Sequence, residues 1–300
     1  MYFIFGIIFS FLIYIIIKPV LFKYAKDIPG ERSSHLKIVP TGGGLIFVIP
    51  IIIYSLFTQN YLFLSLLPLV IIGFLDDILS ISNLLRALIQ ILTIFFIAQF
   101  SYVFSSLPSD LISKILIIFV GFGIVNIFNF MDGLDGLLAS CFLVILSRSI
   151  FYINPEISIL FGSLVVFVIF NWNPAKIFMG DTGSTFLGAI YFIVLLLNFD
   201  FSRILMNLLI ATPLLIDSTS CIFIRLFKKQ NIFLPHKKHL YQRLHQAGFS
   251  HSSVSLMYLM ATLFLVIISF LGNNFYLFFA SLFIVSIGLF LNSNYAIRFE

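Results

Sequence analysis

Residues 126–138 have the sequence NIFNFMDGLDGLL and lie between two of the most hydrophobic stretches of a chain that is 61% apolar. Four polar side chains recur here at intervals of three residues: Asn126, Asn129, Asp132 and Asp135. Polar and ionisable groups at membrane depth are costly, and they usually face a cavity or a functional site. The stretch therefore predicts a membrane fold that keeps a polar site at this point.

The composition places the chain in the membrane class. Its 300 residues have a mean hydropathy of +1.13 and include 39 Phe, while only 10% are charged. Roughly 20 apolar residues cross a bilayer as a helix. We therefore expect an all-α, polytopic integral membrane protein in which residues 1–300 form one domain with about eleven transmembrane helices. The expected segments are 2–22, 44–58, 61–75, 84–100, 111–127, 133–153, 156–171, 183–199, 204–225, 252–271 and 274–292.

Basic residues are distributed unequally among the loops. Most Lys and Arg follow the odd-numbered segments, so the positive-inside rule places those loops in the cytoplasm and the N-terminus outside. The pI of about 9.2 then reflects membrane orientation and not nucleic-acid binding. The same side holds all five histidines and five aspartates, which are His35, His236, His239, His245, His251, Asp76, Asp77, Asp132, Asp135 and Asp181.

This one-sided polarity favours an enzyme at the cytoplasmic membrane surface. A transporter or flippase of a lipid-linked sugar is the alternative, and it would need ionisable residues near the middle of the membrane. Asp217, inside an apolar run, is the candidate for that role. Cys141 and Cys221 also lie in apolar runs and form no metal-type pair, so we expect both to be packing residues.

Two adjacent carboxylates end a short hydrophobic segment in GFLDDILSIS. Asp76 and Asp77 repel each other unless a cation or a proton lies between them, which indicates magnesium or a basic group nearby. A solvated helix end is an equally good explanation for this pair alone.

The stretch NPAKIFMGDTGSTFLG is more specific. Asp181 precedes an apolar helix, where Thr182 and Ser184 are expected to cap the helix while its main-chain N–H groups face an anion. A plain capped turn also explains these residues. It does not explain why Asn171 and Asp181 fall on the side that already holds the other aspartates.

In the opening stretch, Asp132 and Asp135 share a face if the segment is helical, and Gly133 and Gly136 let a ligand or another helix approach. Such carboxylates can accept hydrogen bonds from a nucleobase or a sugar. A buried polar bridge between helices is the competing interpretation.

Two basic segments, DIPGERSSHLKIVPTGGG and FLPHKKHLYQRLHQAGFSH, contain residues typical of phosphate binding. Membrane-surface charge is the alternative, but it accounts poorly for His35, His236 and His239 beside Arg243. Carboxylates that can hold magnesium, with basic groups that can hold phosphates, describe phosphoryl transfer. At a bilayer surface, one substrate is then expected to be a lipid phosphate.

Five of these stretches, ERSSHLKIVPTGGG, GFLDD, NIFNFMDGLDGL, NPAKIFMGDTGS and HKKHLYQRL, occur in an order that identifies a family. The chain resembles the polyprenyl-phosphate N-acetylhexosamine-1-phosphate transferases (glycosyltransferase family 4) from about Asp27 to Gly248. The resemblance implies an enzyme of the bacterial inner membrane that moves a sugar-1-phosphate from a UDP-sugar to undecaprenyl phosphate and releases UMP. It implies Mg²⁺ as the cofactor, with Mn²⁺ as a substitute, and leaves a homodimer open.

The resemblance also implies roles for individual residues. Asp181 matches the main magnesium ligand, Asp77 supports the metal, and Asp76 deprotonates or orients the lipid phosphate. Asp135 matches the uracil contact, and His239 begins the catalytic histidine motif. The remaining residues implied to bind substrate are Lys37, Asn126, Asp132, Asn171, Phe178, His236 and Arg243.

The last cytoplasmic motif departs from the common pattern of the family. Many members have a run of the form HLHH, whereas this chain has His239-Leu240-Tyr241-Gln242 followed by Arg243. The ERSSH and HLYQR forms resemble the branch that uses 6-deoxy-N-acetylhexosamine donors in O-antigen assembly. A catalytically silent scaffold is a further alternative, and the intact set of five aspartates argues against it.

Overall fold

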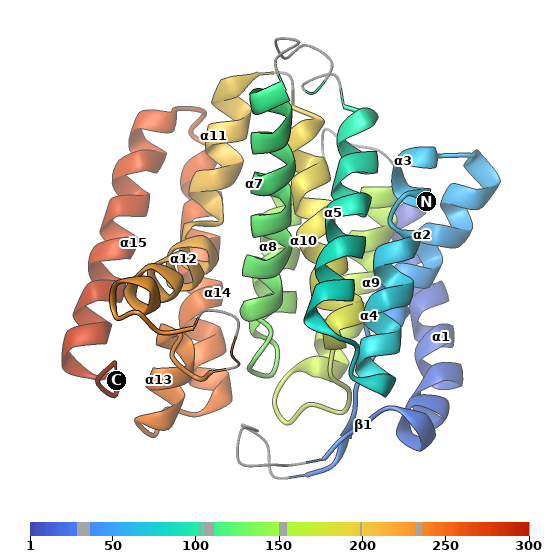
Figure 1. The fold of residues 1–300 in the computed structure, drawn as a ribbon, viewed down its shortest axis with the longest axis horizontal. Coiled ribbons are helices and arrows are strands. Elements are labelled where there is room, and N and C mark those ends of the chain that lie inside the picture. The colour runs from blue at the N-terminus through green and yellow to red at the C-terminus, as the bar shows by residue number, and fades with distance from the viewer. Residues whose placement is uncertain are drawn as a thin grey trace.

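The computed structural model describes residues 1–28, 37–101, 104, 111–149, 155–198, 200–231, 234 and 236–299. They form a helical bundle, and a short antiparallel pair of strands lies at one end of it (Figure 1). The helices are α1 (Tyr2–Tyr24), α2 (Leu45–Thr58), α3 (Tyr61–Leu64), α4 (Leu67–Leu79), α5 (Asn83–Gln99), α7 (Leu111–Phe130), α8 (Leu137–Ser149), α9 (Pro155–Asn171), α10 (Gly180–Leu196), α11 (Phe201–Ile210), α12 (Thr212–Phe227), α13 (Leu240–Gln246), α14 (His251–Ser269) and α15 (Asn274–Asn294). The strands are β1 (Lys26–Asp27) and β2 (Val39–Pro40).

Helix α10 forms the centre of the bundle. Every residue from Thr182 to Leu196 is buried, and the helix packs against α4 and α7. Helices α1 and α9 also pack closely, because position 162 of α9 is glycine and a Cβ there would overlap the carbonyl oxygen of Phe3. Small residues at helix contacts are typical of membrane bundles.

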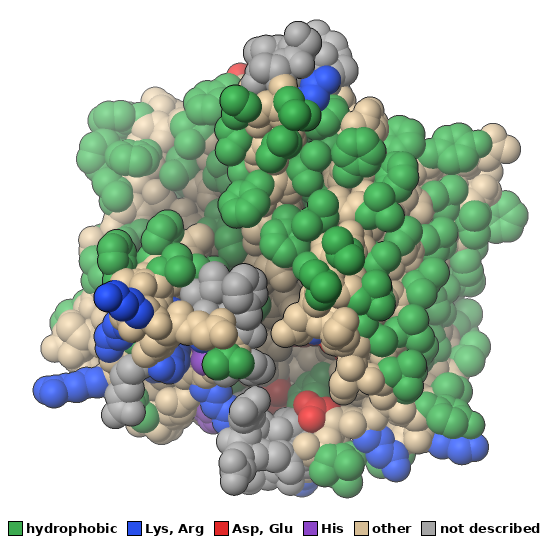
Figure 2. All heavy atoms as spheres, viewed as in Figure 1, with side chains coloured by type: hydrophobic (Ala, Val, Ile, Leu, Met, Phe, Trp, Pro, Cys, Tyr) green, Lys and Arg blue, Asp and Glu red, His purple; other side chains and the backbone are tan. Residues whose placement is uncertain are grey.

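The outer surface is largely apolar. On α15 only Leu277 and Ser281 are buried, and Figure 2 shows hydrophobic side chains covering most of the face that is in view. Water-soluble proteins rarely expose apolar patches of this extent. Five of the described helices are long and apolar enough to cross a membrane, or six if α11 and α12 count as one span. The chain is therefore a multi-pass, all-α membrane protein, as the sequence predicts.

The predicted segments coincide with helices or helix pairs in the structure. Five of them, α2, α5, α8, α9 and α10, are shorter apolar helices. The number of helices that cross the bilayer, and the orientation of the N-terminus, stay predictions.

Three boundaries differ from the sequence-based expectation. The segment 204–225 is not one helix, because α11 and α12 meet at 75° around Ala211, just before Pro213. Residue Pro213 cannot donate a main-chain hydrogen bond, which suits the first turn of a new helix. The segment 133–153 becomes helical only from Leu137, and the polar segment before α14 contains α13.

Candidate active site

Four of the five predicted aspartates meet in a cavity of about 690 Å³, which we call the acid cleft. It lies at the end of the bundle that carries β1 and α13, and Figure 2 shows acidic side chains in a hollow near this end. Six predicted residues line it: Asp77, Asp132, Asp135, Asn171, Phe178 and Asp181. The sequence assigns no role to the other polar and charged residues of the lining, which are Asp27, Thr41, Asn129, Lys237, Gln242, His245 and Gln246.

Asp77 connects α4 to the start of α10. Its Oδ1 accepts a hydrogen bond from the main-chain N–H of Asp181 at 2.9 Å. Its Oδ2 accepts from the N–H and the hydroxyl of Thr182 at 3.2 and 2.6 Å. The two helices approach this closely because position 73 is glycine, where a Cβ would lie 2.8 Å from the main chain of Thr182. Asp77 therefore satisfies the free N–H groups of α10 and holds Asp181 at the cleft.

The sequence predicts an anion at the start of α10, and the carboxylate of Asp77 takes that place. The prediction that Thr182 and Ser184 cap this helix is wrong. The hydroxyl of Thr182 donates to Asp77, and Ser184 Oγ donates to the carbonyl of Gly180 at 3.0 Å. Ser184 Oγ also lies 2.7 Å from the amide of Asn129. The capping carboxylate is 105 residues away from Thr182 in the sequence, so local patterning could not reveal it.

Arg86 on α5 lies between two of the predicted carboxylates. Its Nη1 is 2.7 Å from Asp76 Oδ2, and its Nη2 forms an ion pair with Asp181. The second oxygen of Asp76 accepts the N–H of Ile81 at 2.6 Å. The sequence predicts magnesium or a basic group near Asp76 and Asp77, and Arg86 is such a basic group. In the sequence, nothing distinguishes Arg86 from the other basic residues near the ends of the apolar segments.

The MDGLDG stretch is a loop between α7 and α8, so Asp132 and Asp135 do not share a helix face. Asp135 is anchored at both oxygens: Oδ2 accepts the N–H of Ala175 at 3.1 Å, and Oδ1 is 3.2 Å from His251 Nδ1. His251, at the start of α14, is a second neighbour that the sequence did not indicate.

The carboxyl group of Asp132 is enclosed by like charges. Burial, followed by the negative charge of Asp181, raises the pKa of Asp132 well above its ordinary value. Asp77 and Asp135 add to this effect. A cation bound in the acid cleft would relieve the repulsion among these groups.

The two glycines of the loop admit protein side chains. A Cβ at Gly133 would overlap the Tyr241 hydroxyl, and one at Gly136 would lie 2.6 Å from the Trp172 ring. Gly136 also has φ +74, a conformation that favours glycine. The sequence predicts that these glycines let a ligand or another helix approach. Among the described residues it is a helix, α13, that approaches, through Tyr241.

Asn171 and Asn129 hold the walls of the cleft. Asn171 Nδ2 donates to the carbonyl of Ile177 at 2.9 Å, and its Oδ1 accepts the N–H of Gly136 at 3.0 Å. The side-chain amide nitrogen of Asn129 lies 3.3 Å from Oδ1 of Asp181 and can donate a hydrogen bond to it. Asn171 therefore fixes the loop that carries Asp135, and Asn129 connects α7 to the start of α10.

The structure does not bring every predicted residue to the acid cleft. Lys37 is exposed and is not part of the lining. Asn126 lies on α7, where its Nδ2 donates to Gln90 Oε1 at 3.0 Å. Asp76, His236, His239 and Arg243 also lie outside the lining. His35 falls outside the described residues.

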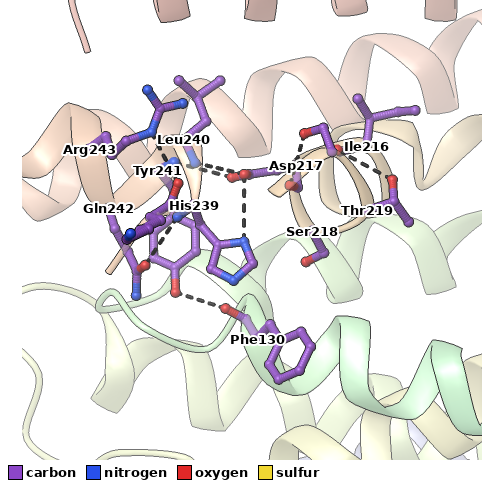
Figure 3. A network of polar contacts seen from close by, with 12 residues as sticks. Phe130, Ile216, Asp217, Ser218, Thr219, His239, Leu240, Tyr241, Gln242 and Arg243 are labelled. Atoms are coloured by element: carbon purple, nitrogen blue, oxygen red, sulfur yellow. Dashed lines mark hydrogen bonds and ion pairs between the residues drawn. The ribbon is translucent and has the colours of Figure 1, made fainter. Parts of the chain in front are cut away.

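The residues that replace the HLHH pattern hold α13 in place (Figure 3). Tyr241 donates its hydroxyl to the carbonyl of Phe130 at 2.8 Å, and Gln242 Oε1 accepts the N–H of His239 at 3.3 Å. Arg243 donates from Nε to the carbonyl of Lys238 at 3.0 Å and from Nη1 to that of Ile297 at 2.9 Å. These substitutions therefore serve the structure of the loop.

The two histidines before α13 differ in charge. Burial, followed by the neighbouring charge of His239, lowers the pKa of His236 to about 4. Burial also acts to lower the pKa of His239, but the carboxylate of Asp217, whose Oδ1 is 3.7 Å from Nδ1, outweighs it and raises this pKa to about 9. Cys221 lies with both imidazoles, and the three ligand atoms are within 4.8 Å of one another. The sequence did not predict this metal-type group around Cys221. Its sulfur and nitrogen atoms are poor ligands for Mg²⁺, and His236 Nδ1 accepts the N–H of Lys238 at 3.2 Å.

Comparison with known proteins identifies relatives that cover most of the chain. It is 33% identical over 290 residues to a "Probable undecaprenyl-phosphate N-acetylglucosaminyl 1-phosphate transferase" of Bacillus subtilis, covering 85% of this chain and 81% of the relative. Residues 60–198 match the model of "Glycosyl transferase family 4". The chain belongs to glycosyltransferase family 4. An undecaprenyl-phosphate α-N-acetylglucosaminyl 1-phosphate transferase of Thermotoga maritima is 30% identical over 213 residues, covering 71% of this chain and 70% of the relative. A phospho-N-acetylmuramoyl-pentapeptide-transferase of Clostridium botulinum is 31% identical over 308 residues, covering 89% and 94%.

The matched family region contains most of the acid cleft. It includes Asp76, Asp77 and Asp181 together with the MDGLDG loop. It ends at residue 198, before α12 and α13. His239 therefore lies outside the region that the family model matches.

Proposed function

We propose that the protein transfers an N-acetylhexosamine-1-phosphate from a UDP-sugar to undecaprenyl phosphate and releases UMP. The observation that carries this proposal is the acid cleft, in which Asp27 and four of the predicted aspartates meet at the end of an apolar helical bundle. The names of the family 4 relatives support the acceptor and the type of group transferred. A charged cleft opening at the end of a membrane bundle suits one water-soluble and one lipid-bound substrate.

The acid cleft fits a divalent cation with oxygen ligands. Asp181 and Asp77 present carboxylates from the start of α10 and the end of α4, and oxygen ligands are those that Mg²⁺ prefers. Asp77 accepts three hydrogen bonds from α10, one at Oδ1 and two at Oδ2, which leaves a lone pair free on Oδ1. Mg²⁺, or Mn²⁺ in its place, would neutralise the diphosphate oxygens of the donor when bound.

The donor nucleotide would lie against the loop between α7 and α8. Asp135 would accept hydrogen bonds from the uracil, while Phe178 offers an aromatic face and Asp132 a second carboxyl group. Lys237 and His245 line the same cleft and can contact phosphate oxygens. Lys37 and Asn126 lie outside the lining and have no role in this proposal.

The lipid phosphate would attack the sugar-bearing phosphorus of the donor directly. One P–O bond forms between a lipid phosphate oxygen and that phosphorus, while the P–O bond to UMP breaks and its electron pair leaves with UMP. Asp76 would accept a residual proton from the lipid phosphate or orient it, and Arg86, which Asp76 contacts at 2.7 Å, would attract the phosphate. His239 would supply a further positive charge.

The polyprenyl chain has a matching surface. An apolar groove of about 580 Å³ runs between α12, α14 and α15 and is lined by side chains such as Ile216, Phe264 and Phe283. Lys238 and Arg243 lie at the same groove. Apolar walls with basic groups among them suit a lipid chain that carries a phosphate.

We further propose eleven membrane spans with the N-terminus outside and the acid cleft facing the cytoplasm of a bacterial inner membrane. The distribution of loop charges supports this orientation. The ERSSH and HLYQR motifs support a 6-deoxy-N-acetylhexosamine donor and a role in O-antigen assembly.

Purified protein in detergent tests the proposal. It would be incubated with Mg²⁺, undecaprenyl phosphate and a panel of UDP-sugars, and released UMP would be measured. We expect UMP release that depends on both substrates and stops in Asp181→Asn. No release with any donor, from protein that remains folded, would refute the proposed function.

A further inference from the structure

Asp217 is a buried carboxylate with several hydrogen-bond partners. It lies on the apolar helix α12, and its side chain is 3% exposed. Its Oδ1 accepts the N–H of Leu240 at 2.7 Å, and its Oδ2 accepts the N–H of Tyr241 at 3.1 Å and the hydroxyl of Tyr258 at 2.6 Å. Burying a carboxylate is costly unless such bonds compensate. These contacts explain Asp217 without a transport pathway.

Two of these bonds fix the start of α13. Leu240 and Tyr241 are the first two residues of that helix, and Figure 3 shows their main chain facing Asp217 of α12. A helix of seven residues has little stability of its own, so its position depends on contacts with the rest of the protein. Asp217 and the carbonyl of Phe130 supply such contacts from two other helices.

The same carboxylate faces the imidazole of His239. Its Oδ1 is 3.7 Å from His239 Nδ1, and the ring lies between Asp217 and Phe130 (Figure 3). Cys221 of α12 and His236 of the preceding segment also face this ring. Tyr241 of α13 stacks beside it. Because Asp217 raises the pKa of His239 to about 9, the imidazole carries a proton at neutral pH.

Helix α13 forms part of two cavities. Gln242 and His245 line the acid cleft, whereas Leu240 and Arg243 line the apolar groove, which Asp217 also reaches. The helix therefore lies between the cleft proposed for the donor and the groove proposed for the lipid chain. A displacement of its first turn would alter both.

We propose that Asp217 is a positioning residue of the transferase, whose carboxylate holds the first turn of α13 and the imidazole of His239 in place between the two cavities. The proposal rests on the proposed function, because it concerns the geometry of that reaction. Asp217 itself touches no substrate in this arrangement. It acts through α13 and His239.

Hydrogen exchange measured by mass spectrometry on the full-length protein tests the contacts without an activity assay. Asp217→Asn keeps the shape of the side chain but removes its charge, and Tyr258→Phe is the matched control that removes one hydrogen bond and leaves the charge. We expect the amides of residues 240–246 to exchange roughly tenfold faster in Asp217→Asn. The pH midpoint for exchange of the His239 ring C2 hydrogen should fall from about 9 to below 6.5. Burial lowers the pKa of this imidazole, and without the charge of Asp217 nothing of similar size would raise it. Tyr258→Phe should keep the high midpoint.

An unchanged midpoint and unchanged amide exchange in Asp217→Asn would overturn the proposal. If Asp217→Asn does not fold, the wild-type protein decides, because a His239 midpoint at or below 6.5 would show that Asp217 does not hold a charged imidazole.

UMP release measured against pH tests the consequence for the reaction. Wild-type activity should fall as the pH rises through about 9, and in Asp217→Asn the fall should come below about 6.5. A loss by the same factor at every pH would indicate a purely structural role and refute positioning through His239. If wild-type protein releases no UMP at any pH, the proposed function fails, while the exchange data still decide the role of Asp217.

Discussion

Replacing Asp181 by Asn should separate activity from folding. The substitution keeps the shape of the side chain but removes the charge proposed to hold the metal. Losing that contact should reduce turnover roughly a thousandfold or more, which corresponds to about 4 kcal/mol of transition-state stabilisation.

The expected change in stability is much smaller. The ion pair between Asp181 and Arg86 is lost, but both side chains are more than a fifth exposed, and pairs of this kind contribute about 0.2–1 kcal/mol. The repulsion that Asp181 exerts on Asp132 is lost as well, and this effect has the opposite sign. We therefore expect the free energy of unfolding to change by no more than about 1 kcal/mol.

UMP release and thermal unfolding in detergent measure the two effects. Asp200→Asn is the matched control, because Asp200 is an exposed aspartate that caps α11 and Asn caps a helix equally well. It should match wild type in both assays. Turnover of Asp181→Asn within tenfold of wild type would refute the assignment of Asp181 to the metal.

Further predictions concern the donor, the metal, the mechanism, the orientation and the pH dependence. Asp135→Ala should raise the KM for the UDP-sugar more than it lowers kcat, whereas an unchanged KM with collapsed kcat would place Asp135 in the chemical step. Removing divalent cations with EDTA should stop UMP release and added Mg²⁺ should restore it; activity that persists without metal would contradict the proposed cofactor. Donor labelled in the phosphate beside the sugar should give no UMP burst and no labelled protein when lipid is absent, and label retained on Asp76 would indicate a covalent intermediate. In intact cells, Lys229→Cys should resist a membrane-impermeant thiol reagent, and efficient labelling would reverse the predicted orientation. The pKa of His239 is raised from 6.5 to about 9, so its ion pair stabilises the fold fully below about pH 6.5 and this stabilisation is lost as the pH rises through about 9. The Tm of wild type should therefore fall more over this window than that of His239→Gln.

The apolar segments could be predicted from the sequence because membrane helices follow from length and hydropathy alone. Their ends were harder to predict, since hydropathy does not show at which residue a helix begins or ends. The predicted segment 133–153 is helical only from Leu137, because Gly133 and Gly136 lie in the loop before α8 and accommodate Tyr241 and Trp172 there. Pro213 is a sequence signal for the bend between α11 and α12. The continuous hydropathy of this region nevertheless favoured one helix.

The acidic residues of the cleft were predictable as residues, because aspartate in an apolar chain is conspicuous. Their partners were not. Arg86 looks like an ordinary loop charge in the sequence, and only the packing of α5 beside α4 brings it to Asp76 and Asp181. His251 likewise reaches Asp135 only through the position of α14.

Two of the aspartates, Asp77 and Asp217, share one physical role. Asp77 accepts the N–H groups that begin α10, and Asp217 accepts those that begin α13, each from a different helix. A carboxylate supplied from another helix satisfies a helix start and ties two helices together in the same contact. This explains how a chain with so few charged residues keeps its polar loops in place: carboxylates from α4 and α12 position Asp181 and His239. It also predicts that Asp77→Asn, unlike Asp181→Asn, should lower the thermal stability along with the activity, because three hydrogen bonds to the start of α10 depend on that carboxylate. Loss of activity in Asp77→Asn with an unchanged Tm would show that Asp77 serves the reaction and not the position of α10.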